Sequence, residues 1–224
     1  MHPMIVTIDG PAGAGKTTVS RILARRLGYR YVDTGALYRG IAFAATNAGI
    51  DPADDKGLEK MLAGMKIGFT VREGSTRLML NEKDITDRIR TPRIAMAASA
   101  VSARPVVRKF LLDIQRELGK EKKAVFEGRD MGTVVFPQAD VKFYLDASVQ
   151  MRAARRFREF EGESGQSMEA VENDIRRRDE NDSNRSLAPL RKADDAIAID
   201  STDMTIDRVV EAMYRHVSKL SGGD

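Results

Sequence analysis

The stretch TIDGPAGAGKTT, residues 7–18, decides the fold of this chain. Its residues 10–17 match the pattern G-x-x-x-x-G-K-[ST], in which backbone N–H groups of a glycine-rich loop cradle phosphate oxygens. The pattern requires a strand before it and a helix after it. Both are expected here, because MIVTID (residues 4–9) is a short β-branched run and VSRILARRLG (residues 19–28) has a helical pattern. A simple connecting turn would not need Lys16 and Thr17, so the stretch predicts a nucleotide-phosphate site.

Each part of this loop is suited to one part of a bound nucleotide. The helix N-terminus adds a favourable dipole, Lys16 is expected to reach the β- and γ-phosphates, and Thr17 is expected to hold Mg²⁺. The residues expected to bind the triphosphate are consecutive: Gly10, Pro11, Ala12, Gly13, Ala14, Gly15, Lys16, Thr17 and Thr18.

Short apolar runs elsewhere in the chain resemble buried strands of a parallel sheet. They are RYVD, AVFE, VKFYLD and AIAID, at residues 30–33, 124–127, 141–146 and 196–200. Helical patterns separate these runs, so the sequence predicts an α/β fold built on a five-stranded parallel sheet.

The expected strands all end in an acidic residue, namely Asp9, Asp33, Glu127, Asp146 and Asp200. Ligands of open α/β sheets bind outside the carboxyl ends of the strands, so this row is expected to face the site. For the last two residues of the row we favour a helix-capping role instead.

The stretch at residues 60–104 interrupts the alternation of strands and helices. KIGFTVR (residues 66–72) and TRLMLN (residues 76–81) alternate apolar and polar residues on either side of a short turn, which predicts an antiparallel hairpin. Thr91 and Pro92 then begin a helix as N-cap and first residue. We expect residues 60–104 to form a small inserted lobe that closes on a ligand, on a core of residues 1–59 and 105–224.

Composition excludes several classes of chemistry. The chain has 224 residues, no Cys, and two His near its ends, so disulfides, thiolate nucleophiles and a histidine in a central cleft are not expected. It has no apolar run long enough to span a bilayer and no leader-like N-terminus, so we expect a cytoplasmic protein with no membrane partner. No long apolar surface stripe is evident, which favours a monomer. The net charge of +4 by itself fits a nucleic acid or a small phosphorylated ligand equally well.

Together with GPAGAGKTT, further segments resemble the bacterial cytidylate kinase family over nearly the whole chain. They are DTGALYRG (33–40), SAVSARPVVR (99–108), EGRDMGTVVFP (127–137) and RRRDENDSNR (176–185), and GRDMGTVVFP is the most specific piece. The resemblance implies transfer of the γ-phosphoryl group of ATP to CMP or dCMP, giving CDP or dCDP and ADP. It also implies a P-loop three-layer fold with an NMP-binding lobe and a short lid.

The acceptor phosphate is expected to meet arginines from separate loops. Arg39, Arg129 and Arg185 lie far apart in the sequence, each in a loop at the expected open edge, where guanidinium forks can converge on one dianion. The resemblance assigns these arginines to the acceptor phosphate and adds Asp33 and Tyr38 to the acceptor site. For the tyrosine, packing is the favoured interpretation.

The resemblance also matches positions that contact the base and the sugar of the acceptor. Ser99, Arg108 and Asp130 match the base-contacting positions, and a carboxylate beside a cation suits the amine and the acceptors of cytosine. Arg178 and Asp182 match positions that hold the sugar hydroxyls. A surface ion pair is the alternative for each arginine, and for the aspartate of GRD the alternative is a salt bridge to the preceding arginine.

RAARRFR, residues 152–158, places Arg152, Arg155 and Arg156 on one face of a helix. The resemblance implies a short lid at about residues 152–170, in which Arg152 stacks on adenine and Arg156 reaches the transferring phosphoryl group. The alternative is an exposed basic face balanced by the acidic residues of 159–163.

No general base is expected, because an acceptor phosphate with a second pKa of about 6 is already ionised at neutral pH. Catalysis is expected to be positioning and charge neutralisation by Lys16, Arg129, Arg156 and Arg185. Mg²⁺ is expected at Thr17, with Asp33 or Glu127 through water. Glu127 stands where many family members carry Asp, so Asp33 is favoured.

Two other functions stay open at this point. One is another small-molecule P-loop kinase, acting on UMP, AMP or a non-nucleotide such as shikimate. The other is a nucleotide-dependent switch that binds nucleic acid, suggested by the isoelectric point near 9.3. Only 6% of the residues are aromatic and none is Trp, so an aromatic platform for RNA is not expected, and no nucleic-acid partner is expected.

Overall fold

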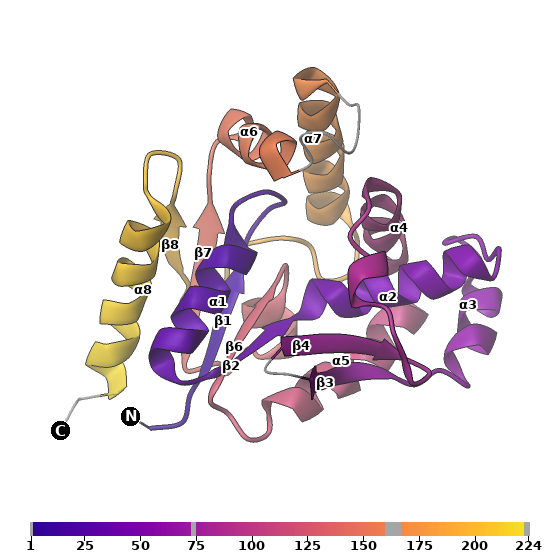
Figure 1. Cartoon of the computed structure of the whole chain (residues 1–224), viewed down its shortest axis with the longest axis horizontal. Coiled ribbons are helices and arrows are strands. Elements are labelled where there is room, and N and C mark those ends of the chain that lie inside the picture. The colour runs from indigo at the N-terminus through magenta and orange to yellow at the C-terminus, as the bar shows by residue number, and fades with distance from the viewer. Residues whose placement is uncertain (1, 73–74, 160–166, 222–224) are drawn as a thin grey trace. The chain divides into compact units, whose positions relative to one another are not determined.

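A computed structural model describes residues 2–72, 75–159 and 167–221 (Figure 1). The expected strands form one five-stranded sheet in the order β2-β6-β1-β7-β8. Their bounds are Ile5–Asp9 (β1), Arg30–Asp33 (β2), Ala124–Gly128 (β6), Val141–Asp146 (β7) and Ile197–Asp200 (β8). β1 pairs in parallel with β6 and with β7, and β7 pairs in parallel with β8. The α/β fold with a five-stranded parallel sheet is therefore confirmed.

The chain divides into two compact units. The first unit comprises Met1–Val32 and Gly119–Asp224, and the second comprises Asp33–Leu118. Besides the sheet, the first unit contains α1 (Lys16–Leu27), a π-helical turn η2 (Met131–Val135), α6 (Val149–Glu159), α7 (Met168–Asn184) and α8 (Ile206–Ser221). None of the helices in the described residues combines the length and the apolar character needed to cross a bilayer.

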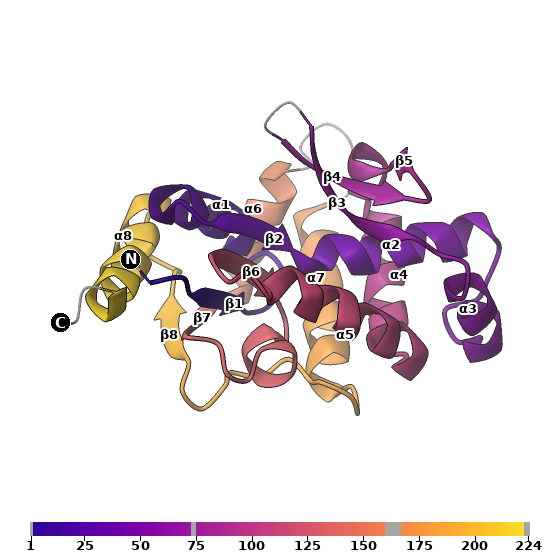
Figure 2. The same cartoon turned by 90° about the horizontal axis from the view of Figure 1, so that it is seen from below.

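The core of the first unit lies between the sheet and two helices. Val6 and Ile8 of β1 point to the same face because side chains alternate along a strand, and they pack with Leu23 of α1 and Met213 of α8. Figures 1 and 2 show α8 alongside α1, and these helices are in contact. The opposite face of β1 is also buried, as Thr7 shows, so this strand has no solvated face to give it a period of two.

The second unit contains a hairpin among helices. Its elements are α2 (Thr34–Asn47), α3 (Asp55–Leu62), β3 (Ile67–Arg72), β4 (Ser75–Leu80), β5 (Lys83–Asp84), the 3-10 turn η1 (Thr86–Arg88), α4 (Pro92–Ser102) and α5 (Pro105–Gly119). β3 pairs antiparallel with β4, which confirms the expected hairpin. The Thr91 side chain accepts from the Ile94 N–H, and Pro92 is the first residue of α4, as expected.

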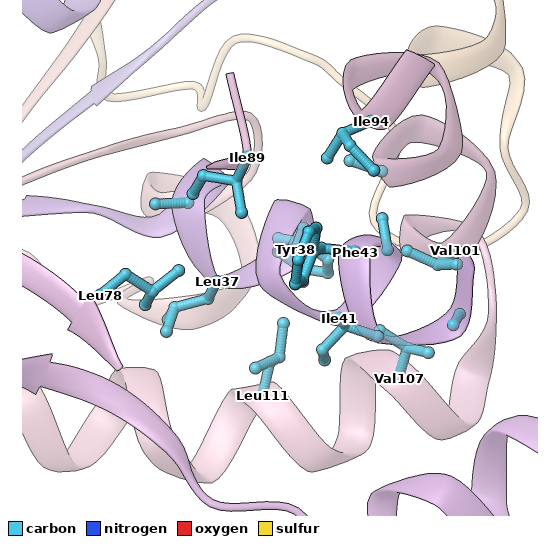
Figure 3. Close-up of a cluster of buried hydrophobic side chains, with 14 of the residues drawn as sticks. Leu37, Tyr38, Ile41, Phe43, Leu78, Ile89, Ile94, Val101, Val107 and Leu111 are labelled. Atoms are coloured by element: carbon cyan, nitrogen blue, oxygen red, sulfur yellow. The ribbon is translucent and has the colours of Figure 1, made fainter. Parts of the chain in front are cut away.

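One hydrophobic cluster fills the second unit (Figure 3). Leu37 and Ile41 of α2 contribute to it together with Leu78 of β4 and Leu111 of α5, all at most 1% exposed. Gly40 lets α2 approach the hairpin, because a Cβ there would lie 2.5 Å from the Cδ1 of a β3 side chain. Since α2 and α5 share this cluster, the unit extends beyond the expected lobe of residues 60–104 at both ends.

Candidate active site

The loop between β1 and α1 has a backbone that requires glycine. Gly10, Gly13 and Gly15 have φ angles of 149°, 74° and 86°, in the region that side chains disfavour. A Cβ on Gly10 would also lie 2.0 Å from the carbonyl oxygen of Leu145 in β7. The loop is therefore a sharp turn seated on the neighbouring strand.

Lys16 begins α1 and is buried beside this loop. Its Nζ donates to the carbonyl oxygen of Pro11 at 2.6 Å. Burial, with repulsion from Arg129 and Arg178, lowers the pKa of Lys16 well below its usual value, against the attraction of Glu127 and of Asp9. Burial is thus the main cause of the lowered pKa, and both positive and negative groups act on this ammonium group.

The hydroxyl of Thr17 contacts a carboxylate, which is the kind of oxygen ligand that Mg²⁺ prefers. Its Oγ1 donates to Oε1 of Glu127 at 2.8 Å, and the hydroxyl of Tyr31 donates to the same oxygen at 2.8 Å. Mg²⁺ is commonly held by one or two carboxylates together with substrate phosphates, so this donor set fits the ion. Within the described residues there is no group of three or more acidic or histidine side chains that would form a protein-only metal cage.

The first unit brings five of the expected acceptor residues together. The Nε of Arg129 donates to Asp182 at 3.0 Å, and Arg185 forms an ion pair with Asp130 at 3.6 Å. Burial alone would raise the pKa of Asp182, but Arg129, Arg178 and Arg185 together lower it. Three guanidinium groups therefore act on one buried carboxylate. In this grouping arginines outnumber carboxylates, which suits a further anion.

The second unit holds Asp33 and Arg39 in contact. Asp33 accepts from the Ala36 N–H at 2.9 Å as the N-cap of α2, and from Arg39 at 2.7 Å. Burial alone would raise the pKa of Asp33, but Arg39 and Arg90 lower it. The Nε of Arg39 is buried and has no hydrogen-bond partner in the described part of the chain.

The expected base-reading residues of the second unit lie around α2, α4 and α5. The guanidinium of Arg108 lies 5.8 Å from the ring centroid of Tyr38, and it donates to the carbonyl oxygen of Ser102 at 3.1 Å. Ser99 is buried on α4, and its carbonyl oxygen accepts from the Ser102 hydroxyl. Tyr38 is itself 9% exposed and belongs to the hydrophobic cluster, which fits the packing role favoured for it.

These contacts bring together two of the three arginines that are expected to meet one dianion. Arg129 and Arg185 share the surroundings of Asp182 in the first unit. Arg39 belongs to the second unit, so its place at the same phosphate stays a prediction.

The arginines expected in the lid differ in their surroundings. Arg152 is 5% exposed, and its guanidinium donates to the carbonyl oxygens of Ala147 and Ala12 and to Asp179. Arg156 is partly exposed and donates to Glu159 at 3.1 Å. Residues 160–166 of the expected lid lie outside the described residues.

Several contacts of the site were not expected from the sequence. Asp9 accepts from the N–H groups of Met131 and Gly132 at 2.9 and 2.8 Å, which ties the end of β1 to η2. Asp179 accepts from the Ala12 N–H at 3.1 Å. The sequence offered a signal for both aspartates, since each lies inside a segment already singled out, but nothing in it named their partners.

Comparisons with known proteins find relatives over nearly the whole chain. A family model described as cytidylate kinase matches residues 6–219. A cytidylate kinase of Geobacter sulfurreducens is 49% identical over 211 residues, which cover 94% of this chain and 91% of that protein. A cytidylate kinase of Pseudomonas aeruginosa is 46% identical over 220 residues, covering 97% and 96%.

Solved structures with low sequence identity show the same fold. A gluconokinase from Sinorhizobium meliloti aligns with a TM-score of 0.53 at 15% identity, covering 97% of this chain and 93% of its own. A shikimate kinase from Acinetobacter baumannii in complex with shikimate aligns with a TM-score of 0.50 at 16% identity, covering 99% and 97%. The fold described above is thus shared with these two kinases.

Proposed function

Because the chain belongs to the cytidylate kinase family, it transfers the γ-phosphoryl group of ATP to CMP or dCMP, and we propose which residues carry out that transfer. The loop at residues 10–18 holds the triphosphate of ATP. Arg129 and Arg185 hold the phosphate of the acceptor, and Arg39 of the second unit contributes to it. Ser99, Arg108 and Asp130 contact the base, and the sugar hydroxyls meet Arg178 and Asp182.

One observation carries this assignment: cations of the acceptor group act directly on the lysine of the donor loop. Burial is the main cause that lowers the pKa of Lys16, and Arg129 and Arg178 lower it further against Glu127 and Asp9. The same two arginines lower the pKa of Asp182 against the effect of its burial. Like charges gathered in a buried region are unfavourable unless an anion offsets them. Phosphate groups on both substrates would provide that anion, so the charge pattern supports two adjacent phosphate sites.

The chemistry needs no proton acceptor from the protein. The acceptor phosphate is largely a dianion at neutral pH, since its second pKa is about 6. Lys16, Arg129, Arg156 and Arg185 stabilise the negative charge that spreads over the transferring group. Arg156 exchanges its surface partner Glu159 for that group, which is a small change for a partly exposed side chain.

Mg²⁺ is the cofactor that we propose for this reaction. Thr17 and Glu127 would hold it, and bound there it would neutralise charge on the donor phosphates. Asp33 is the carboxylate that the sequence favours, but its oxygens accept from Arg39 and from the Ala36 N–H, both within the second unit. The contact between Thr17 and Glu127 supports Glu127 instead.

An acceptor panel tests the proposed function. Purified protein with ATP and Mg²⁺ is given CMP, dCMP, UMP or AMP, and ADP formation is followed by a coupled assay. We expect CMP and dCMP to give the highest kcat/KM. The Lys16→Ala variant should lose turnover by roughly 100-fold or more at unchanged melting temperature, because it removes charge stabilisation of the transition state. Faster turnover of UMP or AMP, or a folded Lys16→Ala protein at near-normal rate, would refute the assignment.

We propose further that the enzyme is a cytoplasmic monomer, with ATP and CMP or dCMP as its partners and no nucleic acid or membrane. The absence of Cys from the sequence suits a reducing compartment. Light scattering behind a sizing column measures the oligomeric state, and a mass of twice 24.8 kDa would contradict a monomer.

A further inference from the structure

Carbonyl oxygens of the phosphate loop accept from one cation of the loop itself and from two arginines of α6. The Nζ of Lys16 donates to Pro11, and a guanidinium nitrogen of Arg152 donates to Ala12 at 3.0 Å. A guanidinium nitrogen of Arg155, one turn further along α6, lies 3.4 Å from the carbonyl oxygen of Ala14. The loop is therefore attached to α6 at two of its peptide groups.

A trans peptide group is planar, so its C=O and the following N–H point in opposite directions. Holding the carbonyl oxygen of Ala12 fixes the direction of the Gly13 N–H, and holding that of Ala14 fixes the Gly15 N–H. N–H groups of this loop are the ones that cradle phosphate oxygens. Capture of the carbonyl oxygens thus sets the direction of phosphate-binding donors before any nucleotide arrives.

Asp179 of α7 completes the arrangement on the same stretch of the loop. It accepts from the Ala12 N–H and also from Arg152, so one residue of the loop is held on both sides by two side chains that bind each other. The backbone of the loop also packs closely on the backbone of α6, because a Cβ on Gly13 would lie 3.0 Å from the carbonyl oxygen of Arg152. The side chains of Arg152 and Asp179 are only 6% and 19% exposed.

We propose that Arg152, Arg155 and Asp179 are positioning residues that preset the phosphate-binding N–H groups of the loop and attach α6 and α7 to it. The proposal rests on the proposed function, in which this loop holds the triphosphate of ATP. It gives Arg152 a role different from stacking on adenine, which would require the guanidinium to leave the carbonyl oxygens and the carboxylate that it now binds.

The loss of Arg152 and the loss of Asp179 should have different effects on the binding of an anion at the loop. Removing Arg152 leaves the carboxylate of Asp179 without its cation beside the loop, where it repels a triphosphate. Removing the carboxylate leaves a guanidinium that still binds two carbonyl oxygens and attracts the anion. The two substitutions should therefore be unequal, and the second should relieve part of the damage caused by the first.

The experiment is a double-mutant cycle on nucleotide binding, measured by calorimetry without an acceptor. We expect Arg152→Ala to weaken the binding of ATP by roughly 10- to 100-fold, as for the loss of hydrogen bonds from a charged group. The same substitution should weaken the binding of inorganic tripolyphosphate, which has no base, by a similar factor. Asp179→Asn should cost less, and the double variant should bind ATP more tightly than Arg152→Ala alone.

Controls separate positioning from loss of fold. Arg176→Ala removes an exposed arginine of α7 that pairs with Glu172, and it should leave ATP binding unchanged. Arg152→Lys keeps the charge beside Asp179 and should retain most of the affinity. Arg155→Ala tests the second attachment point and should weaken ATP and tripolyphosphate alike. Melting temperatures identify any variant that does not fold, and the remaining variants then decide.

Two results would overturn the proposal. If Arg152→Ala weakened ATP but left tripolyphosphate unchanged, the arginine would be acting on the base. If the double variant were no tighter than Arg152→Ala, the carboxylate would have no part in the effect. Failure of the proposed function would look different, since a wild-type protein that binds ATP but forms no CMP-dependent ADP leaves this cycle readable.

Discussion

Among single residues, Asp9 connects the phosphate loop to the turn η2. This buried carboxylate ends β1, directly before the phosphate loop, and its oxygens accept from two N–H groups of η2. The turn η2 follows Arg129 and Asp130, which we assign to the acceptor. Burial raises the pKa of Asp9 from 3.8 to about 6, although those N–H groups oppose the shift.

Asp9 therefore makes stability depend on pH. Because its pKa is higher in the folded than in the unfolded state, the folded chain binds the proton more tightly, and this contribution is fully present below pH 3.8. It is lost as pH rises to about 6, by roughly 3 kcal/mol in the free energy of unfolding. Asp9→Asn cannot titrate, so the difference in unfolding free energy between the two proteins should change by that amount over this range. Urea denaturation at pH 4, 5, 6 and 7 measures it, and a difference that stays constant would contradict the prediction.

Asp130 is the residue that we expect to decide the choice of base. Asp130→Asn keeps the size of the side chain but removes the negative charge that pairs with Arg185 and suits the amine of cytosine. The kcat/KM for CMP should fall by roughly 100-fold, the value for UMP should fall much less, and the KM for ATP should change little. Steady-state kinetics with both acceptors provide the test. Equal losses for every acceptor would assign Asp130 to the ion pair alone.

At the scale of elements, the turn from β1 into α1 tolerates no side chain at its first glycine. Gly10→Ala would place a methyl group 2.0 Å from the carbonyl oxygen of Leu145, so strand or loop must shift, at a cost of several kcal/mol. Gly28→Ala is the matched control. Gly28 also has a left-handed φ, 67°, but a methyl group there would meet nothing within 4 Å, so we expect a loss of only about 1 kcal/mol. Guanidinium denaturation compares the two, and equal losses would contradict the steric argument.

Elements with a local signal were predictable from the sequence. The five strands are short β-branched runs. Thr91 and Pro92 mark the start of α4, because a Thr side chain caps the first turn of a helix and Pro suits its first position. α2 was not predicted as a helix, because Gly35 and Gly40 lower its intrinsic propensity. The second of these glycines nevertheless lies where α2 packs on the hairpin, and a side chain there would have to displace the end of Ile67, which only the fold reveals.

The face of α5 was predicted one residue away from its centre. The pattern PVVRKFLLDIQREL from Pro105 predicts one face made of Val106, Phe110, Ile114 and Leu118. The first three are only partly buried, whereas Val107 and Leu111 are fully buried. Apolar residues stand next to each other in this helix, so periodicity alone cannot choose between adjacent stripes. The turn η2 was missed for a related reason, since a π-helical turn has no sequence pattern of its own and depends on Asp9 for two of its hydrogen bonds.

The site was predictable where residue type alone implies a partner outside the chain. Glycines, Lys16 and Thr17 in fixed spacing imply a phosphate, and arginines far apart in the sequence imply an anion. The expectation that Arg39 lies in a loop was wrong, because it lies within α2. The contacts of Asp179 and Tyr31 could not be derived in this way, because their partners Ala12 and Glu127 lie 167 and 96 positions away in the sequence. Such pairs depend on the assembled fold.

At the scale of the whole molecule, each compact unit has a hydrophobic cluster of its own. Leu23 belongs to the cluster of the first unit and Leu111 to that of the second, and both are fully buried. Truncation of either leucine to Ala should cost about 2–5 kcal/mol through lost burial and an unfilled cavity. The affected region should differ between them.

Hydrogen exchange followed by mass spectrometry distinguishes the two leucine variants. Leu111→Ala should accelerate exchange across residues 33–118 first, whereas Leu23→Ala should accelerate it in the sheet and helices of the first unit. Uniform acceleration over the whole chain by both variants would mean that the two clusters open together. The exchange rates of both variants would then report the global stability of the chain and not the stability of one unit.

The hydrogen bond from Tyr31 to Glu127 gives the chain an intrinsic optical reporter. There is no Trp to dominate the emission, and Tyr31 is one of only five tyrosines. An excited phenol readily gives its proton to a bonded carboxylate, which quenches its fluorescence. A magnesium nucleotide that drew Glu127 away from the phenol would therefore brighten Tyr31, so the native, unlabelled enzyme can signal loading of its donor site.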